Sequence, residues 1–204
     1  EIIKLRQKKQ VMKFRFDPNL EYQTKAIRAV IGLFEGAPRH EPRINVFAGN
    51  GVVRNGLDLD ESALFENLQA VQGDPDLQNG NTQIVSEALD SLDFSVEMET
   101  GTGKTYVYLR TALELYKTYG LRKFIVVVPS VAIREGVLKT LRMTKEHFSQ
   151  LYDNLPYRFY EYDSGNLARV RQFASSNDLE IMVMTLDSFN KDSNIFNRRM
   201  DRMM

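Results

Sequence analysis

Hydrophobic positions follow two periodicities along the chain. Alternation or a continuous apolar run, which is typical of strands, occurs at residues 11–16, 44–47, 94–97, 123–128, 157–162 and 180–184. A spacing of three or four residues, which is typical of amphipathic helices, occurs at residues 20–35, 64–71, 82–92, 104–119, 131–141 and 166–173. From residue 94 onward, strands and helices alternate. This order predicts βαβ units and a parallel sheet.

The segment 123–128 is apolar from Phe124 to Val128 and is ended by Pro129. Such a run is expected of a parallel strand buried on both faces. Ligands of parallel sheets bind at the carboxyl ends of the strands. A glycine-rich loop, residues 129–130 and Thr185 all follow predicted strands, so we predict an α/β fold with a binding site on this edge.

The glycine-rich loop runs from Met98 to Thr105, between a predicted strand and a predicted helix. Gly101 and Gly103 lack a Cβ atom, so the backbone can turn tightly and point its N–H groups inward. The helix that follows adds unpaired N–H groups and the positive end of its dipole. Lys104 would then contact the β- and γ-phosphates of a nucleotide, and the Thr105 hydroxyl would bind Mg²⁺.

This loop departs from the full phosphate-loop pattern at one position. The pattern begins with glycine, and the chain has Met98 there. The alternative interpretation is a surface turn before a helix. We favour nucleotide binding, because the strand before the loop and the helix after it are also predicted. The loop residues assigned to the nucleotide are Thr100, Gly101, Thr102, Gly103, Lys104 and Thr105.

Charge and composition limit the classes of protein. The 204 residues include 27 basic and 27 acidic side chains and no cysteine. No overall field therefore draws the chain to nucleic acid or membrane, and disulfides and thiolate metal sites are excluded. Neither a signal peptide nor a membrane-spanning run is visible, so we expect a cytoplasmic protein. Because the chain begins at Glu1 and ends in a basic run, we expect a piece of something longer.

Four segments together form an ordered set. Residues 98–105 resemble motif I of superfamily 2 helicases, in which the first glycine is commonly replaced, so Met98 fits. Residues 126–133 resemble motif Ia, residues 181–185 resemble motif Ib, and residues 20–27 resemble the adenine-recognising glutamine motif. Over residues 11–196, their order and spacing are similar to the start of type III restriction enzyme Res subunits.

The resemblance implies a RecA-like P-loop parallel sheet with flanking helices, incomplete, together with an N-terminal helical and insert region. Residues 1–38 would hold a strand and the glutamine-motif helix, and residues 94–204 a partial first motor domain. Residues 39–93 would be an insert of mixed helix and loop. We hypothesise that this insert packs on the motor as an accessory element for the partner subunit.

The resemblance also implies a function. This would be the ATP-binding part of a DNA motor in a type III restriction endonuclease, using ATP and Mg²⁺ on double-stranded DNA beside a Mod methyltransferase subunit. Family members carry an Asp-Glu motif II after motif Ib, and no such pair follows Thr185. We therefore expect this chain to bind a nucleotide without hydrolysing it efficiently, since phosphoryl transfer depends on groups outside it.

The resemblance places the base beside Tyr22 and Gln23. The amide of Gln23 has a donor and an acceptor, so it can make paired hydrogen bonds to an adenine edge. Its alternative is a solvent-facing helix residue. Tyr22 would stack on the base. An equally good alternative is an aromatic residue packed at the start of a helix.

Nucleic-acid contacts are predicted at the ends of two strands. Pro129, Ser130 and Arg134 would meet the phosphate backbone through a helix N-terminus and a basic side chain, and Thr185 would touch it from motif Ib. The alternative is an ordinary strand end with a solvated helix face.

Three other classes of function remain to be weighed. The first is a superfamily 2 DNA or RNA helicase without a nuclease. A small-molecule kinase would use the same loop, but it predicts a complete first glycine and a lid over the acceptor, and neither is seen. A binding module without catalysis is the third class.

Overall fold

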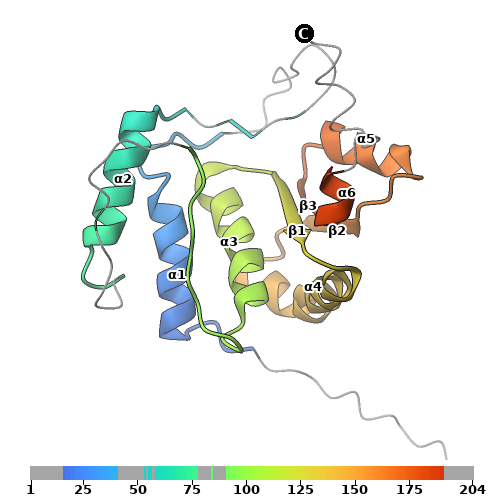
Figure 1. Cartoon of the computed structure of the whole chain (residues 1–204), viewed down its shortest axis with the longest axis horizontal. Coiled ribbons are helices and arrows are strands. Elements are labelled where there is room, and N and C mark those ends of the chain that lie inside the picture. The colour runs from blue at the N-terminus through green and yellow to red at the C-terminus, as the bar shows by residue number, and fades with distance from the viewer. Residues whose placement is uncertain are drawn as a thin grey trace, which may run out of the picture.

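The structure, a computed structural model, describes residues 16–40, 53, 55, 56, 58–77, 84 and 91–190 (Figure 1). The strand expected at 44–47, all but the last residue of the strand expected at 11–16, and most of the helix expected at 82–92 lie outside the described residues. The helices are α1 (Glu21–Gly32), α2 (Glu61–Gly73), α3 (Lys104–Tyr119), α4 (Val131–Leu151), α5 (Leu167–Ser175) and α6 (Leu186–Asn190).

The predicted parallel sheet is present. Its strands are β1 (Lys123–Val128), β2 (Tyr157–Glu161) and β3 (Leu179–Thr185), in the spatial order β1-β3-β2, and both pairings are parallel. Helix α4 connects β1 to β2, and α5 connects β2 to β3. This arrangement is that of a partial RecA-like P-loop fold.

Helices cover both faces of the sheet at its centre. Alternate residues of β3 point to opposite faces, and the whole strand is buried. Leu179, Ile181 and Val183 pack in the main core with residues of α3 and α4, whereas Met182 and Met184 pack with residues of α5. The two faces of β3 therefore explain its continuous apolar run.

The expectation that 123–128 is buried on both faces is wrong. Phe124 and Val126 pack against the main core, but Ile125 and Val127 are each 41% exposed. Within the described residues, β1 pairs only with β3, and the packing of α5 is against residues of β2 and β3. One face of this edge strand is therefore partly open to solvent.

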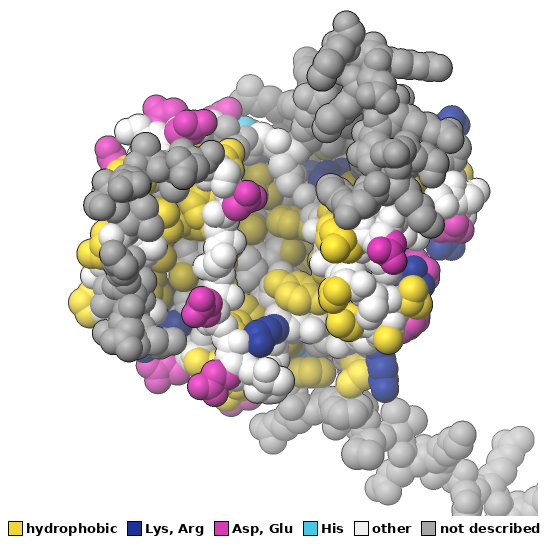
Figure 2. All heavy atoms as spheres, viewed as in Figure 1, with side chains coloured by type: hydrophobic (Ala, Val, Ile, Leu, Met, Phe, Trp, Pro, Cys, Tyr) yellow, Lys and Arg dark blue, Asp and Glu magenta, His cyan; other side chains and the backbone are white. Residues whose placement is uncertain are grey.

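The strand expected at 94–97 is also absent, because these residues are extended but pair with no other strand of the described chain. Val96 is 46% exposed. A hollow of about 520 Å³ lies between this segment, α3 and β1, and its lining includes Val96, Met98, Ala112 and Ile125. In Figure 2 hydrophobic side chains are visible in the hollow at the middle of this face.

Helix α4 runs ten residues beyond the predicted end at 141, since its buried stripe continues through Thr144 and Phe148. The shorter α1 packs on α3, and α2 lies on the other side of α1 (Figure 1). The Tyr119 hydroxyl donates to the Ile31 carbonyl at 3.1 Å, and the Asn67 amide donates to the carbonyl of Leu33. In the part of the chain that is described, no helix has the length and apolarity needed to cross a membrane.

Candidate functional site

The glycine-rich loop adopts a conformation that only glycine takes readily. Gly101 and Gly103 both have φ of 84°, in the left-handed region. Gly103 is the N-cap of α3, and its carbonyl accepts the hydrogen bond from Val107 N–H that begins the helix. The Thr102 hydroxyl donates to the Glu99 carbonyl at 2.6 Å, which closes the loop. The loop therefore ends at a helix N-terminus, as the nucleotide-binding interpretation requires.

Gln23 lies directly against this loop. Its side-chain amide nitrogen donates to the Thr102 carbonyl at 2.8 Å, and the residue is only 6% exposed. A Cβ atom on Gly103 would lie 2.7 Å from the same nitrogen. The φ angle of Gly103 favours glycine at this position, and a Cβ atom there would displace the amide end of Gln23.

Gln23 is accordingly not the solvent-facing residue of the alternative interpretation. Its neighbour Tyr22 is 47% exposed, which does not fit a packed aromatic side chain and leaves its ring accessible for stacking. The structure therefore brings Gln23 against the loop, with Tyr22 next to Gln23 on the first turn of α1. The assignment of Tyr22 and Gln23 to an adenine base remains a prediction.

Lys104 begins α3 with an exposed side chain beside the hollow. No carboxylate of the described residues forms an ion pair with it. Thr105 follows on the first turn and is half-buried. The described chain contains no group of three or more His, Asp or Glu side chains that could hold a metal. The Mg²⁺ role of Thr105 remains a prediction.

The other candidate segments meet at one sheet edge. Val128 and Thr185 are register partners at the ends of β1 and β3, so Pro129 and Ser130 lie next to Thr185. Pro129 and Ser130 are exposed, and Ser130 caps α4 by accepting a hydrogen bond from Ile133 N–H at 3.4 Å. These two residues are accessible for a backbone contact.

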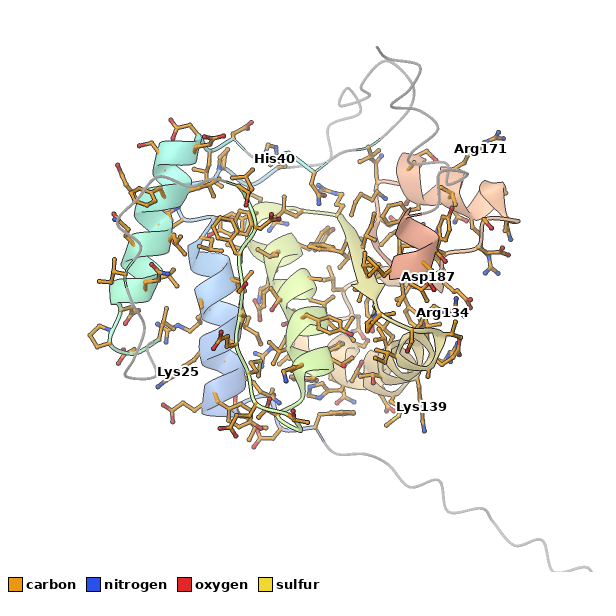
Figure 3. The ribbon with its side chains drawn as sticks, in the orientation of Figure 1. Lys25, His40, Arg134, Lys139, Arg171 and Asp187 are labelled. Carbon is orange, nitrogen blue, oxygen red and sulfur yellow. The ribbon has the colours of Figure 1, made fainter. Side chains whose placement is uncertain are left out.

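Thr185 and Arg134 are less available than the sequence suggests. Thr185 is 5% exposed, and its hydroxyl bonds to that of Ser188 at 2.9 Å. Arg134, which projects from α4 (Figure 3), forms an ion pair of 2.6 Å with Glu161 at the end of β2. Its side chain is 15% exposed. Both remain predicted nucleic-acid contacts, and each already has a partner within the chain.

The comparisons with known proteins agree with this geometry. Residues 18–202 match the family described as "Type III restriction enzyme, res subunit". The chain belongs to this family.

Three Res subunits illustrate the similarity. The EcoPI Res subunit of Escherichia phage P1 is 35% identical over 146 residues, which are 69% of this chain and 14% of that protein. The EcoP15I Res subunit of Escherichia coli is 31% identical over 194 residues, 91% of this chain and 18% of that protein. The StyLTI Res subunit of Salmonella typhimurium is 40% identical over 106 residues, 51% of this chain and 11% of that protein. The chain thus spans less than a fifth of these relatives.

Sequence reasoning missed two residues that shape this Res-subunit site. Glu161 holds Arg134, and Arg110 of α3 donates to the Pro18 carbonyl just before α1. Neither could be found from local patterns, because the contact partners are far apart in the chain. A basic residue on a predicted helix face is usually solvated, and nothing in its neighbours marks Arg110 as an exception.

Proposed function

We propose that this Res-subunit chain is the ATP-binding part of a DNA translocase motor that couples ATP hydrolysis to DNA cleavage in a longer protein. The observation that carries the proposal is the loop itself. Two left-handed glycines place its backbone at the N-terminus of α3, with exposed Lys104 at the start of the helix and buried Gln23 on the loop. The fold and the family support the same assignment.

In this proposal the nucleotide is ATP with Mg²⁺. Lys104 would neutralise phosphate oxygens, Thr105 would contact the metal, and loop residues 100–103 would donate backbone N–H groups. Gln23 and Tyr22 would recognise the base. The bound nucleotide supplies the phosphoryl group, and the residues of this chain bind and orient it.

The partners are duplex DNA and a Mod methyltransferase subunit, and the compartment is the cytoplasm. Pro129, Ser130, Arg134 and Thr185 would form the DNA-facing edge. The Res-subunit relatives favour this assignment over a helicase without a nuclease. We also propose the division into residues 1–38, the insert 39–93 and the motor part 94–204. Packing of α2 against the end of α1, through Asn67, supports an accessory role for the insert.

Calorimetric titration with ATP and Mg²⁺ tests the proposal. Lys104→Ala removes the charge that meets the phosphates, so we expect affinity to fall by about tenfold or more, as for loss of a charge-assisted hydrogen bond. Lys145→Ala, which changes an exposed lysine on α4, should bind like the wild type. Equal affinity of Lys104→Ala and the wild type would remove the phosphate-loop assignment.

A further inference from the structure

Helix α1 begins without a cap of its own. Its N-cap residue is Leu20, whose side chain cannot accept a hydrogen bond from the first turn. The residues proposed to recognise the base, Tyr22 and Gln23, lie in that first turn. Their position must therefore be set by contacts from elsewhere in the fold.

One such contact comes from α3. Arg110 Nη1 donates to the Pro18 carbonyl at 2.5 Å, across 92 positions of the chain. The Arg110 side chain is 12% exposed, so water competes little for this hydrogen bond. Pro18 lies two residues before the N-cap, in a turn that is itself closed by a bond from Asn19 N–H to the Asp17 carboxylate.

Arg110 is in turn held by other groups. Its Nε atom donates to the Tyr152 hydroxyl at 3.3 Å, and its Nη2 atom lies 3.8 Å from Glu114 Oε1. The Tyr152 hydroxyl donates to the same Glu114 oxygen at 2.7 Å. Arg110 therefore links the segment before α1 to α3 and to the C-terminal end of α4, and its side chain has one defined direction.

A second contact holds the other side of the turn. The Phe16 ring stacks on Tyr106 of α3, with centroids 5.9 Å apart and an interplanar angle of 9°. It also lies 5.3 Å from the His147 ring of α4. Together, Phe16 and Arg110 hold the entry to α1 against the helix that carries Lys104.

We propose that Arg110 is a positioning residue for base recognition, which holds the entry of α1 so that Tyr22 and Gln23 meet the base of a nucleotide bound at the loop. This inference rests on the proposed function and deepens it. Arg110 touches neither the loop nor the place of the phosphates. In the first two turns of α3, Val107 and Leu109 are 5% and 1% exposed, so burial of these side chains also holds the start of the helix. Loss of Arg110 therefore affects the base and spares the phosphates.

The test compares three probes on the 204-residue chain by calorimetry: ATP, GTP and inorganic tripolyphosphate, each with Mg²⁺. Arg110→Met keeps much of the side-chain length without the donors. We expect the affinity of this variant for ATP to fall about tenfold, towards its affinity for GTP, because about one hydrogen bond to the base is misplaced. Its affinity for tripolyphosphate should not change. If the ratio of ATP to GTP affinity is unchanged, the inference is wrong. An equal loss of affinity for all three probes would also overturn it, because that result would mean that Arg110 only stabilises the fold.

Two further variants make the result specific. Arg110→Lys retains a charged donor and should restore part of the preference for ATP. Tyr152→Phe removes one of the groups that hold Arg110 but leaves the Arg110–Pro18 bond, so it should lower the preference for ATP less than Arg110→Met does. Should Arg110→Met not fold, the ratio measured on Arg110→Lys and Arg110→Gln decides in the same way. If the wild type binds ATP and GTP equally, the base-recognition part of the proposed function has failed and this inference fails with it.

Discussion

Gln23 of α1 donates its side-chain amide to the carbonyl oxygen of Thr102, 79 positions away, at 2.8 Å. The bond joins the helix that would read the base to the loop that would hold the phosphates. Because Gln23 is 6% exposed, the contact is shielded from water.

Gln23→Ala removes this bond and leaves the Thr102 carbonyl without it. We expect the free energy of unfolding to fall by about 1 kcal/mol and the preference for ATP over GTP to disappear. Chemical denaturation and calorimetry measure the two effects. Gln150→Ala, at an exposed position on α4, is the control for both. A variant at Gln23 that keeps the wild-type preference would rule out its adenine role.

Gly103→Ala should damage the loop more than the loss of one hydrogen bond. The new Cβ atom would meet Gln23 Nε2 at 2.7 Å, and φ of 84° disfavours alanine by about 1–2 kcal/mol. We expect lower stability and weaker ATP binding. Gly136→Ala is the matched control, because a Cβ atom there meets nothing within 4 Å and helical alanine is favoured over glycine by about 0.5–1 kcal/mol. Stabilisation by both substitutions would contradict the loop geometry.

The ion pair between Arg134 and Glu161 makes the DNA prediction testable in both directions. Glu161→Gln removes the closer of the two carboxylates paired with Arg134, Glu135 at 3.4 Å being the other, so affinity for duplex DNA should rise by about twofold at low salt. Arg134→Ala should lower the affinity and reduce the salt slope by about 1. Fluorescence anisotropy against salt concentration measures both. Arg158→Ala is the control, because Arg158 pairs with Asp178 near the opposite, amino end of β2. If Arg134→Ala leaves the salt slope unchanged, Arg134 does not contact phosphate.

Neighbouring residues of β1 point to opposite faces of the sheet, so the same substitution should lower the free energy of unfolding by different amounts at each. Val127 is 41% exposed and Val128 is 6% exposed. Val127→Thr should change the free energy of unfolding by less than about 0.5 kcal/mol, while Val128→Thr buries a hydroxyl and should cost about 1–3 kcal/mol. Denaturant titrations of the two variants compare these values directly. Equal costs would mean that both side chains are buried, contrary to the described edge strand.

His147 predicts a loss of stability in mild acid. Burial, and then the positive charge of Arg110, lower the pKa of His147 below its ordinary value of 6.5. The unfolded chain therefore binds more protons than the folded one near this pH, so stability falls as the pH drops through and below 6.5. The neutral ring can accept the 2.9 Å hydrogen bond from the Tyr106 hydroxyl, and the charged ring cannot.

Thermal unfolding at about pH 7.5 and about pH 5.5, on either side of the ordinary histidine pKa, measures this effect. His147→Gln should show a smaller drop in melting temperature between the two values than the wild type. Gln150→Ala, at an exposed position on α4, is the control and should keep the wild-type drop. The same drop in all three proteins would assign the pH dependence to other groups.

Local patterns were enough for most of the described helices and for the glycine-rich turn before α3. Gly103 and Gly120 lie at the two ends of α3, where the backbone is left-handed. A glycine at a helix end can be recognised from the sequence alone. The apolar spacing also predicts α4. It predicts an end at residue 141, which is too early, because the buried stripe beyond that residue includes the polar Thr144. These features depend on residues within a few positions of one another.

The pairing and burial of strands, and the side-chain contacts across the fold, depended on the tertiary structure. Residues 94–97 have the apolar pattern of a strand but no pairing partner in the described chain, and 123–128 has a continuous apolar run but one partly open face. A strand requires hydrogen bonds to a neighbour, and burial requires a covering layer. Likewise, the bonds of Gln23 to Thr102 and Arg110 to Pro18 join residues distant in the chain. A helix is specified by residues close together in the sequence. These contacts form only when folding brings together residues that are distant in the sequence.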